Sequence, residues 1–360
     1  MKIQGINYYN NLSFGSNRRK FDVQGHIGTM YDNGQKITYN SQNIIDTVAP
    51  NNVTKVLVSS LSGLNAQGVD TFCSETDAAS EIKSMPNNSN VKLYPLLSCQ
   101  PGITQDTSVA EQLLEENKFY GLKFHPSNTN QPIKDNFEIY SKYVSLAEKK
   151  GLPCVFHSVN DGKSNPTEII KLAENHPKHP FVLYHINLAA QPEQMLKTID
   201  DISNSINSGK SNLFVDISWL TNLWDNAEQN KNTIKYALEK LGADRILFGS
   251  DTPITEMGDK NNYGKFADFV ENTVNEFYKD KPKEADTALN KIFYDNAEEL
   301  FIKKNWFKPA TEKQASKTKA ILIGAGIAAV AIAAIALKCF NKGEKPVKDT
   351  PSHVNKNNTK

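Results

Sequence analysis

Metal-binding side chains stand at or near the ends of four short apolar runs in this chain. The runs PCVFHS, FVLYHIN and RILFGSDTP carry His157, His185 and Asp251, and the run KFDVQGHIG carries His26. Imidazole and carboxylate groups are the usual protein ligands of zinc and of neighbouring divalent transition metals. Four such residues at matching positions of β-like runs predict a metal-dependent active site formed by the ends of several strands.

Apolar runs recur along the chain between residues 20 and 300, about thirty residues apart, which is the length of one strand–helix unit. The eight runs cover residues 21–28, 53–61, 91–99, 120–126, 152–158, 181–187, 212–220 and 245–253. The stretches between them carry helix signals, and 286–301 reads as a closing amphipathic helix. This alternation predicts an α/β fold, a (β/α)8 TIM barrel over residues 20–302. A doubly wound open sheet is the alternative, but it favours a GxGxxG first turn, and GHIGTM lacks that pattern.

Each run also predicts which residues face the barrel interior, because side chains two apart on a strand point to the same side. The expected inward sets are Asp22, Gln24 and His26; Lys123 and His125; Val155 and His157; Leu183 and His185; and Leu247, Gly249 and Asp251. Lys123, His125 and Trp219 lie at the rim, where we expect them to contact a small-molecule substrate. The predicted site is therefore a ring of residues and not a linear motif.

Several pieces of the sequence resemble one enzyme family, in order, over about residues 20–302. These pieces are FDVQGHIG, GLKFHP, PCVFHS, HPFVLYHINLA, GADRILFGSDTP and YDNAEELF. They look like the amidohydrolase superfamily, in the branch that contains amidohydrolase-related proteins and aminocarboxymuconate-semialdehyde decarboxylase. The resemblance implies a metal-dependent TIM barrel in which His26, His157 and Asp251 hold a divalent metal, zinc in the first place and manganese as the alternative. His185 would then bind metal or assist catalysis.

Gln24 departs from the family pattern, because it stands where the first histidine of an HxH pair is expected. An amide oxygen is a weaker donor than imidazole, although Gln24 still belongs to the expected ligand set. The resemblance implies hydrolysis of an amide, lactone or ester bond, or non-oxidative decarboxylation of a small carboxylic acid. Asp251 would act as general base and then acid, and His185 would stabilise an oxyanion or protonate the leaving group. A catalytically degenerate, membrane-tethered barrel that acts as a binding module is the alternative.

Charge and cysteine content exclude other classes of function. Lys and Arg total 41 against 40 Asp and Glu, so the net charge of +1 gives no electrostatic case for a nucleic-acid partner. The 4 cysteines lack CxxC spacing and indicate reduced thiols of a cytosolic compartment.

The C-terminal part of the chain predicts a membrane anchor. Residues 320–337 read AILIGAGIAAVAIAAIAL, without a charged or polar side chain, and as a helix they would span about 27 Å. We expect a transmembrane helix at 320–340, preceded by a Lys-rich linker at 303–319 and followed by a hydrophilic tail at 341–360. Residues 1–19 read as a polar extension without a signal-like apolar stretch, so we expect the barrel to lie in the cytoplasm. Small residues four apart in the span would also allow a homodimer.

Overall fold

The computed structural model describes residues 18–32, 35–60, 79, 83, 90–99, 101, 106–188, 190–218, 227–254 and 261–307. The chain divides after Phe307 into two units, and the described residues belong to the first. Within the described ranges, no helix is long and apolar enough to cross a bilayer. The predicted span at 320–340 lies outside these ranges, as does Trp219, so both stay predictions.

Parallel strands form on all eight apolar runs. They are β1 (Lys20–Asp32), β3 (Val53–Ser60), β4 (Lys92–Pro95) with β5 (Leu97–Cys99), β6 (Leu122–Phe124), β7 (Cys154–Val159), β8 (Pro180–Leu188), β9 (Asn212–Asp216) and β10 (Ile246–Leu247). One set pairs in the order β1–β3–β4 and the other in the order β5–β6–β7–β8–β9–β10, with every one of these pairs parallel.

Backbone hydrogen bonds join the two sets of strands into a ring. The Leu96 N–H donates to the Val58 carbonyl at 2.8 Å, which connects β3 to the β4–β5 strand. At the other seam, the Val23 N–H donates to the Phe248 carbonyl at 3.0 Å and the His26 N–H to the Thr252 carbonyl at 2.8 Å. Because both seams are hydrogen-bonded, the predicted α/β barrel is confirmed over the open-sheet alternative.

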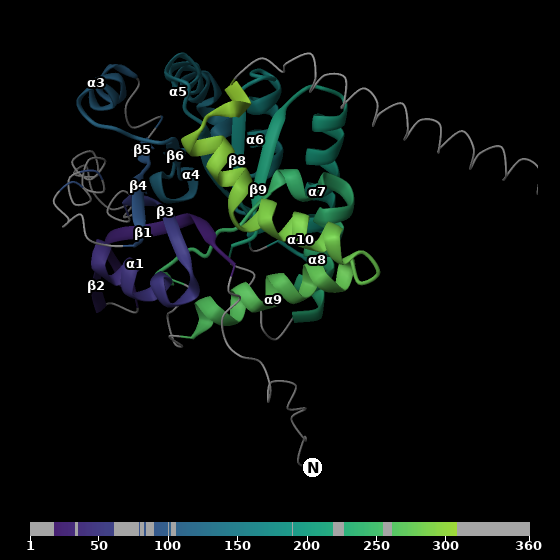
Figure 1. Cartoon of the computed structure of the whole chain (residues 1–360). Helices are drawn as coiled ribbons and strands as arrows, with labels where there is room; N and C mark the ends of the chain where they lie inside the picture. Colours follow the sequence, from purple (N-terminus) through teal and green to yellow (C-terminus); the bar gives the residue numbers. More distant parts are fainter. Residues whose placement is uncertain are drawn as a thin grey trace, which may run out of the picture. The chain divides into compact units, whose positions relative to one another are not determined.

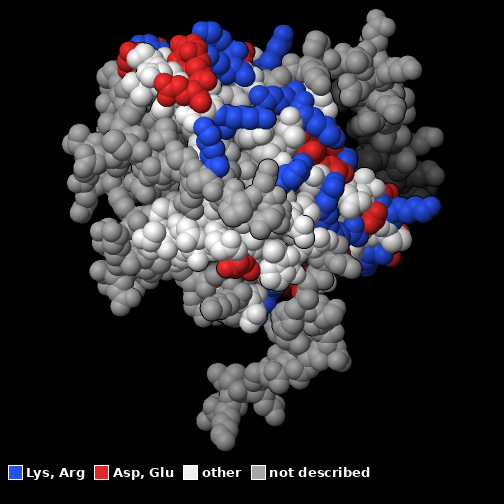
Figure 2. All heavy atoms as spheres, turned by 60° about the vertical axis from the view of Figure 1, so that its left-hand side comes forward, with Lys and Arg blue, Asp and Glu red and all other residues white. Residues whose placement is uncertain are grey.

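Helices surround the strands (Figure 1). They are α1 (Ser41–Val48), α3 (Ser108–Glu116), α4 (Pro126–Thr129), α5 (Phe137–Lys150), α6 (Pro166–Glu174), α7 (Pro192–Asn207), α8 (Ala227–Leu241), α9 (Asn262–Phe277) and α10 (Pro282–Asn290). Helix α5 buries an apolar face and ends at Gly151, whose φ of 62° is left-handed. Charged side chains pair on the helices, as in the 2.8 Å ion pair between Lys149 of α5 and Glu111 of α3. Figure 2 shows acidic and basic side chains close together at the top of its view.

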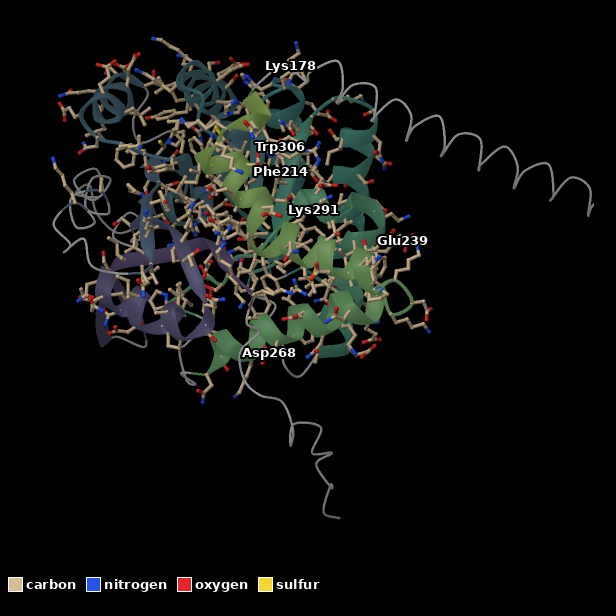
Figure 3. All side chains as sticks on the ribbon, viewed as in Figure 1. Lys178, Phe214, Glu239, Asp268, Lys291 and Trp306 are labelled. Carbon is tan, nitrogen blue, oxygen red and sulfur yellow. The ribbon has the colours of Figure 1, made fainter. Side chains whose placement is uncertain are left out.

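A separate apolar cluster fills the barrel interior. Its strand residues are Phe21, Val23, Leu57, Leu96, Val155, Val182, Tyr184, Phe214 and Leu247. Two π-helical segments, Lys291–Asp295 and Glu298–Ile302, add Tyr294, Leu300 and Phe301 to the same cluster. Trp306 then packs edge-on against Phe214 with ring centroids 4.8 Å apart (Figure 3). This end of the barrel is therefore filled by apolar side chains, and polar chemistry is left to the other end.

Two local details of the fold go beyond the sequence analysis. The helix expected at 286–301 begins earlier, at Pro282, and continues as π-helix from Lys291. A strand that the sequence did not predict, β2 (Gln35–Tyr39), pairs antiparallel with the end of β1. β1 therefore runs on past His26 as the first half of a hairpin, because the next segment offers it a partner.

Candidate active site

Asp251 lies at the centre of a buried hydrogen-bond group at the carboxyl ends of the strands. Its Oδ1 atom is 2.8 Å from Nε2 of His26 and accepts a hydrogen bond from Nε2 of Gln24 at 2.7 Å. On the other side of the ring, Nδ1 of His26 is 2.9 Å from Oγ of Ser59, its register partner on β3. Burial opposes ionisation of Asp251, but the hydrogen bond and charge of His26 hold its pKa below the usual value. Asp251 is therefore ionised at neutral pH.

His185 reaches this group by a left-handed backbone conformation. Strand alternation puts Tyr184 in the interior and Leu183 in the layer under the helices, so the expected inward pairing of Leu183 with His185 was wrong. At a φ of 66° the backbone breaks the alternation, and the His185 ring joins the site. The His185 N–H donates to Oδ1 of Asp216 at 2.7 Å, which stabilises this conformation.

His157 and His125 extend the site across the neighbouring strands. The His125 and His157 rings stack with centroids 3.8 Å apart and planes inclined by 15°. His157 meets the His185 ring edge-on at 5.0 Å. Burial lowers the pKa of all three, to about 4 for His185 and well below the usual value for the other two. All three imidazoles are therefore neutral at pH 7.

Asp22 does not share the face of Gln24 and His26, contrary to the expectation from alternation. The register between β1 and β3 shifts between Asp22 and Gly25. The Asp22 carboxylate instead accepts hydrogen bonds from the hydroxyls of Ser250 and Tyr263 and from the Gln24 N–H. Burial raises the pKa of Asp22 to about 6. Asp22 thus ties β1 to the segment that carries Asp251.

Asp216 and Ser218 belong to the site, although the sequence analysis did not single them out. The Ser218 hydroxyl lies 2.6 Å from Oε1 of Gln24, 2.8 Å from Nδ1 of His185 and 2.7 Å from Oδ1 of Asp216. Burial raises the pKa of Asp216 to about 7. Both residues lie in the apolar run 212–220, where Asp216 is the last residue of β9 and Ser218 follows two residues later, so the polar positions of this run were the signal that could have found them.

Lys123 is a buried amine facing the same interior. Its Nζ lies 4.0 Å above the Tyr184 ring centroid and has no hydrogen-bond partner among the described residues. Burial lowers its pKa to about 7, against the opposing charges of Asp216 and Asp251. An unpaired buried amine beside neutral imidazoles is suited to an anionic group of a substrate.

Lys123 should make the stability of the fold depend on pH. Its folded pKa of about 7 lies below its usual 10.5, so between these values the unfolded chain binds a proton that the folded chain lacks. Stability therefore rises with pH in this window, by up to about 1.4 kcal/mol per pH unit. Lys123→Met should be more stable than the wild type at pH 7, and this advantage should shrink by pH 10. Urea unfolding of both proteins at the two pH values measures their free energies of unfolding. A stability difference between them that does not change with pH would contradict the lowered pKa of Lys123.

His157 and Asp251, two of the predicted metal ligands, are in the protonation states that a divalent metal needs. Metal ligands must be deprotonated, and the structure offers neutral imidazoles around an ionised Asp251. As they stand, no three His, Cys, Asp or Glu side chains in the described ranges are grouped to hold an ion. The Gln24 amide was expected to turn its oxygen to the metal, and instead its nitrogen faces Asp251. The ligand set His26, His157, Asp251 and Gln24 stays a prediction.

Comparison with known proteins assigns the family. The amidohydrolase family model matches residues 104–302, which include His125, His157, His185 and Asp251. This chain belongs to the amidohydrolase family. A search of curated proteins found no match. Family membership supports an enzymatic role for the chain.

Solved structures share its fold. The probable 2-pyrone-4,6-dicarboxylic acid hydrolase of Acinetobacter baumannii is 14% identical with a TM-score of 0.53, covering 79% of this chain and 99% of that one. The 2,6-dihydroxybenzoate decarboxylase of Rhizobium is 13% identical with a TM-score of 0.55, covering 79% and 98%. An uncharacterised TIM-barrel protein of Bordetella bronchiseptica is 16% identical with a TM-score of 0.50, covering 74% and 84%. At these identities the likeness establishes a TIM-barrel fold.

Proposed function

We propose that this chain is a metal-dependent enzyme that hydrolyses an amide, lactone or ester bond, or decarboxylates a small carboxylic acid. The observation that carries the proposal is the convergence of His26, Asp251, His185, His157 and His125 at the carboxyl ends of the strands. A TIM-barrel enzyme places its chemistry at this end. Zinc is the first candidate for the metal and manganese the second, with His26, His157 and Asp251 as the residues that would hold it.

Each of three side chains has its own role in the proposed reaction. When bound, the metal supplies Lewis-acid activation of water and of a substrate carbonyl. Asp251, ionised and held by His26, accepts and returns a proton at its carboxylate. Lys123 pairs with a carboxylate of the substrate, because its Nζ is buried and has no hydrogen-bond partner in the part of the chain that the structure describes. His125, partly buried at the mouth, contacts the substrate beside His157.

Elemental analysis combined with a substrate panel tests this proposal. Full-length protein purified without chelators should bind zinc or manganese at about one ion per chain. It should turn over at least one member of a panel of small aromatic acids, lactones and amides, and EDTA should stop the reaction. Protein that takes up neither metal and turns over no substrate of the panel would contradict the proposal.

A further inference from the structure

We infer that Ser218 is a positioning residue that fixes the tautomer of His185 and the orientation of the Gln24 amide. Ser218 is 1% exposed, and its hydroxyl touches Gln24 Oε1, His185 Nδ1 and Asp216 Oδ1 at 2.6–2.8 Å. These three atoms come from three different strands or their ends. One hydroxyl group therefore sets the hydrogen bonding of two side chains that face Asp251.

The proton count at Ser218 decides the state of His185. A hydroxyl donates one hydrogen and accepts others, while Gln24 Oε1 and Asp216 Oδ1 face it as acceptors. Asp216 Oδ1 also accepts from the N–H groups of His185 and Ser218, at 2.7 Å and 3.2 Å, so no proton resides on it. The hydroxyl hydrogen goes to Gln24 Oε1, because Asp216 Oδ1 already has its two backbone N–H donors; if Ser218 donated to His185 Nδ1 instead, Gln24 Oε1 would face the hydroxyl oxygen without a hydrogen between them. His185 Nδ1 therefore carries a proton and donates it to Ser218.

The contacts of the other ring nitrogen, Nε2, indicate the same tautomer of His185. The Gln24 Nε2 atom, which is only a donor, lies 3.4 Å from His185 Nε2. Its orientation is set at both ends, because Gln24 Nε2 donates to Asp251 and Gln24 Oε1 accepts from Ser218. A hydrogen on His185 Nε2 would point at this amide hydrogen, whereas a lone pair accepts it. His185 therefore presents a lone pair at Nε2 to the site.

This tautomer changes the role expected for His185. A neutral ring with a lone pair at Nε2 accepts a proton or binds an ion, and it donates to an oxyanion only after it has been protonated. His185 therefore takes up a proton before it can deliver one to a leaving group. This catalytic consequence rests on the proposed function, whereas the tautomer does not.

Two-bond proton–nitrogen NMR of the full-length protein labelled with ¹⁵N-histidine tests the inference. The His185 signals, assigned by their loss in His185→Gln, should show the Nδ1–H tautomer. Ser218→Ala should lower the ratio of Nδ1–H to Nε2–H at least about fivefold, as loss of one hydrogen bond implies. Ser218→Thr should restore the wild-type ratio, because threonine keeps the hydroxyl.

Ser59→Ala is the matched control. It removes the hydroxyl that lies 2.9 Å from His26 Nδ1, so it should change the His26 signals and leave those of His185 unchanged. An Nε2–H tautomer in the wild type, or an unchanged ratio in folded Ser218→Ala, would overturn the inference. If Ser218→Ala does not fold, the wild-type spectrum decides alone. The measurement uses neither substrate nor metal, so its failure is distinguishable from failure of the proposed function.

Discussion

Replacing Asp251 with alanine is expected to lower zinc affinity by at least about a hundredfold and to abolish turnover. Asp251 Oδ1 holds both His26, at 2.8 Å, and the Gln24 amide nitrogen, at 2.7 Å. The substitution removes an ionised carboxylate from a group of neutral imidazoles and leaves two buried donors without their acceptor. Isothermal titration of the full-length protein with zinc chloride, together with elemental analysis, measures the loss.

Two further variants test the predicted ligands: one removes the charge of Asp251 but keeps its shape, and the other replaces Gln24 with a better donor. Asp251→Asn keeps the volume and one acceptor oxygen but loses the negative charge, so it should fold and still lose zinc affinity. Gln24→His should act in the opposite direction and tighten zinc binding at least about tenfold, because an imidazole lone pair replaces an NH₂ group that cannot bind a metal. Zinc affinity that is the same in Asp251→Asn as in the wild type would refute Asp251 as a ligand.

Replacing Gly249 with alanine is expected to destabilise the protein by about 3 kcal/mol and to displace side chains of the site. A Cβ atom there would lie 2.4 Å from Oδ2 and 3.0 Å from Cγ of Asp216, and 3.3 Å from Cβ of Gln24. Asp216 cannot move without giving up the hydrogen bonds that it accepts from the backbone N–H groups of His185 and Ser218. Urea denaturation at neutral pH measures the change in the free energy of unfolding.

Gly162 provides the control for Gly249. Its φ of +78° strains any other residue, but a Cβ would meet nothing within 4 Å, so Gly162→Ala should cost only about 1 kcal/mol. If the clash with Asp216 is the cause, Gly249→Ala should cost at least about 2 kcal/mol less in an Asp216→Ala background than in the wild type. Equal costs in the two backgrounds would point to another cause.

Asp216 thus links the stability of the barrel to the geometry of the site. One carboxylate accepts hydrogen bonds from the backbone N–H groups of the left-handed His185 and of Ser218, and it imposes the requirement for glycine at 249. Burial of this carboxylate raises its pKa to about 7, so the arrangement carries an energetic cost. In the proposed enzyme, this cost maintains the orientation of the groups around Asp251.

The repeating apolar runs were enough to predict the strands and the barrel. Each strand is a short buried segment whose identity depends on its own residues, so local composition determines where it lies. For the same reason, simple alternation correctly placed Lys123 and His157 toward the interior. Side chains on a regular strand inherit their direction from their neighbours in sequence.

Only the tertiary structure decided the position of His185, the direction of Asp22 and the orientation of the Gln24 amide. Each departs from the local pattern because of a partner far away in sequence: Asp216 for the His185 N–H, Ser250 and Tyr263 for Asp22, and Ser218 with Asp251 for Gln24. A left-handed residue or a register shift breaks the two-residue period, and the hydrogen bond that compensates it comes from another strand or helix. Such a bond depends on which strands and helices the fold brings together, so alternation along one strand could not predict it.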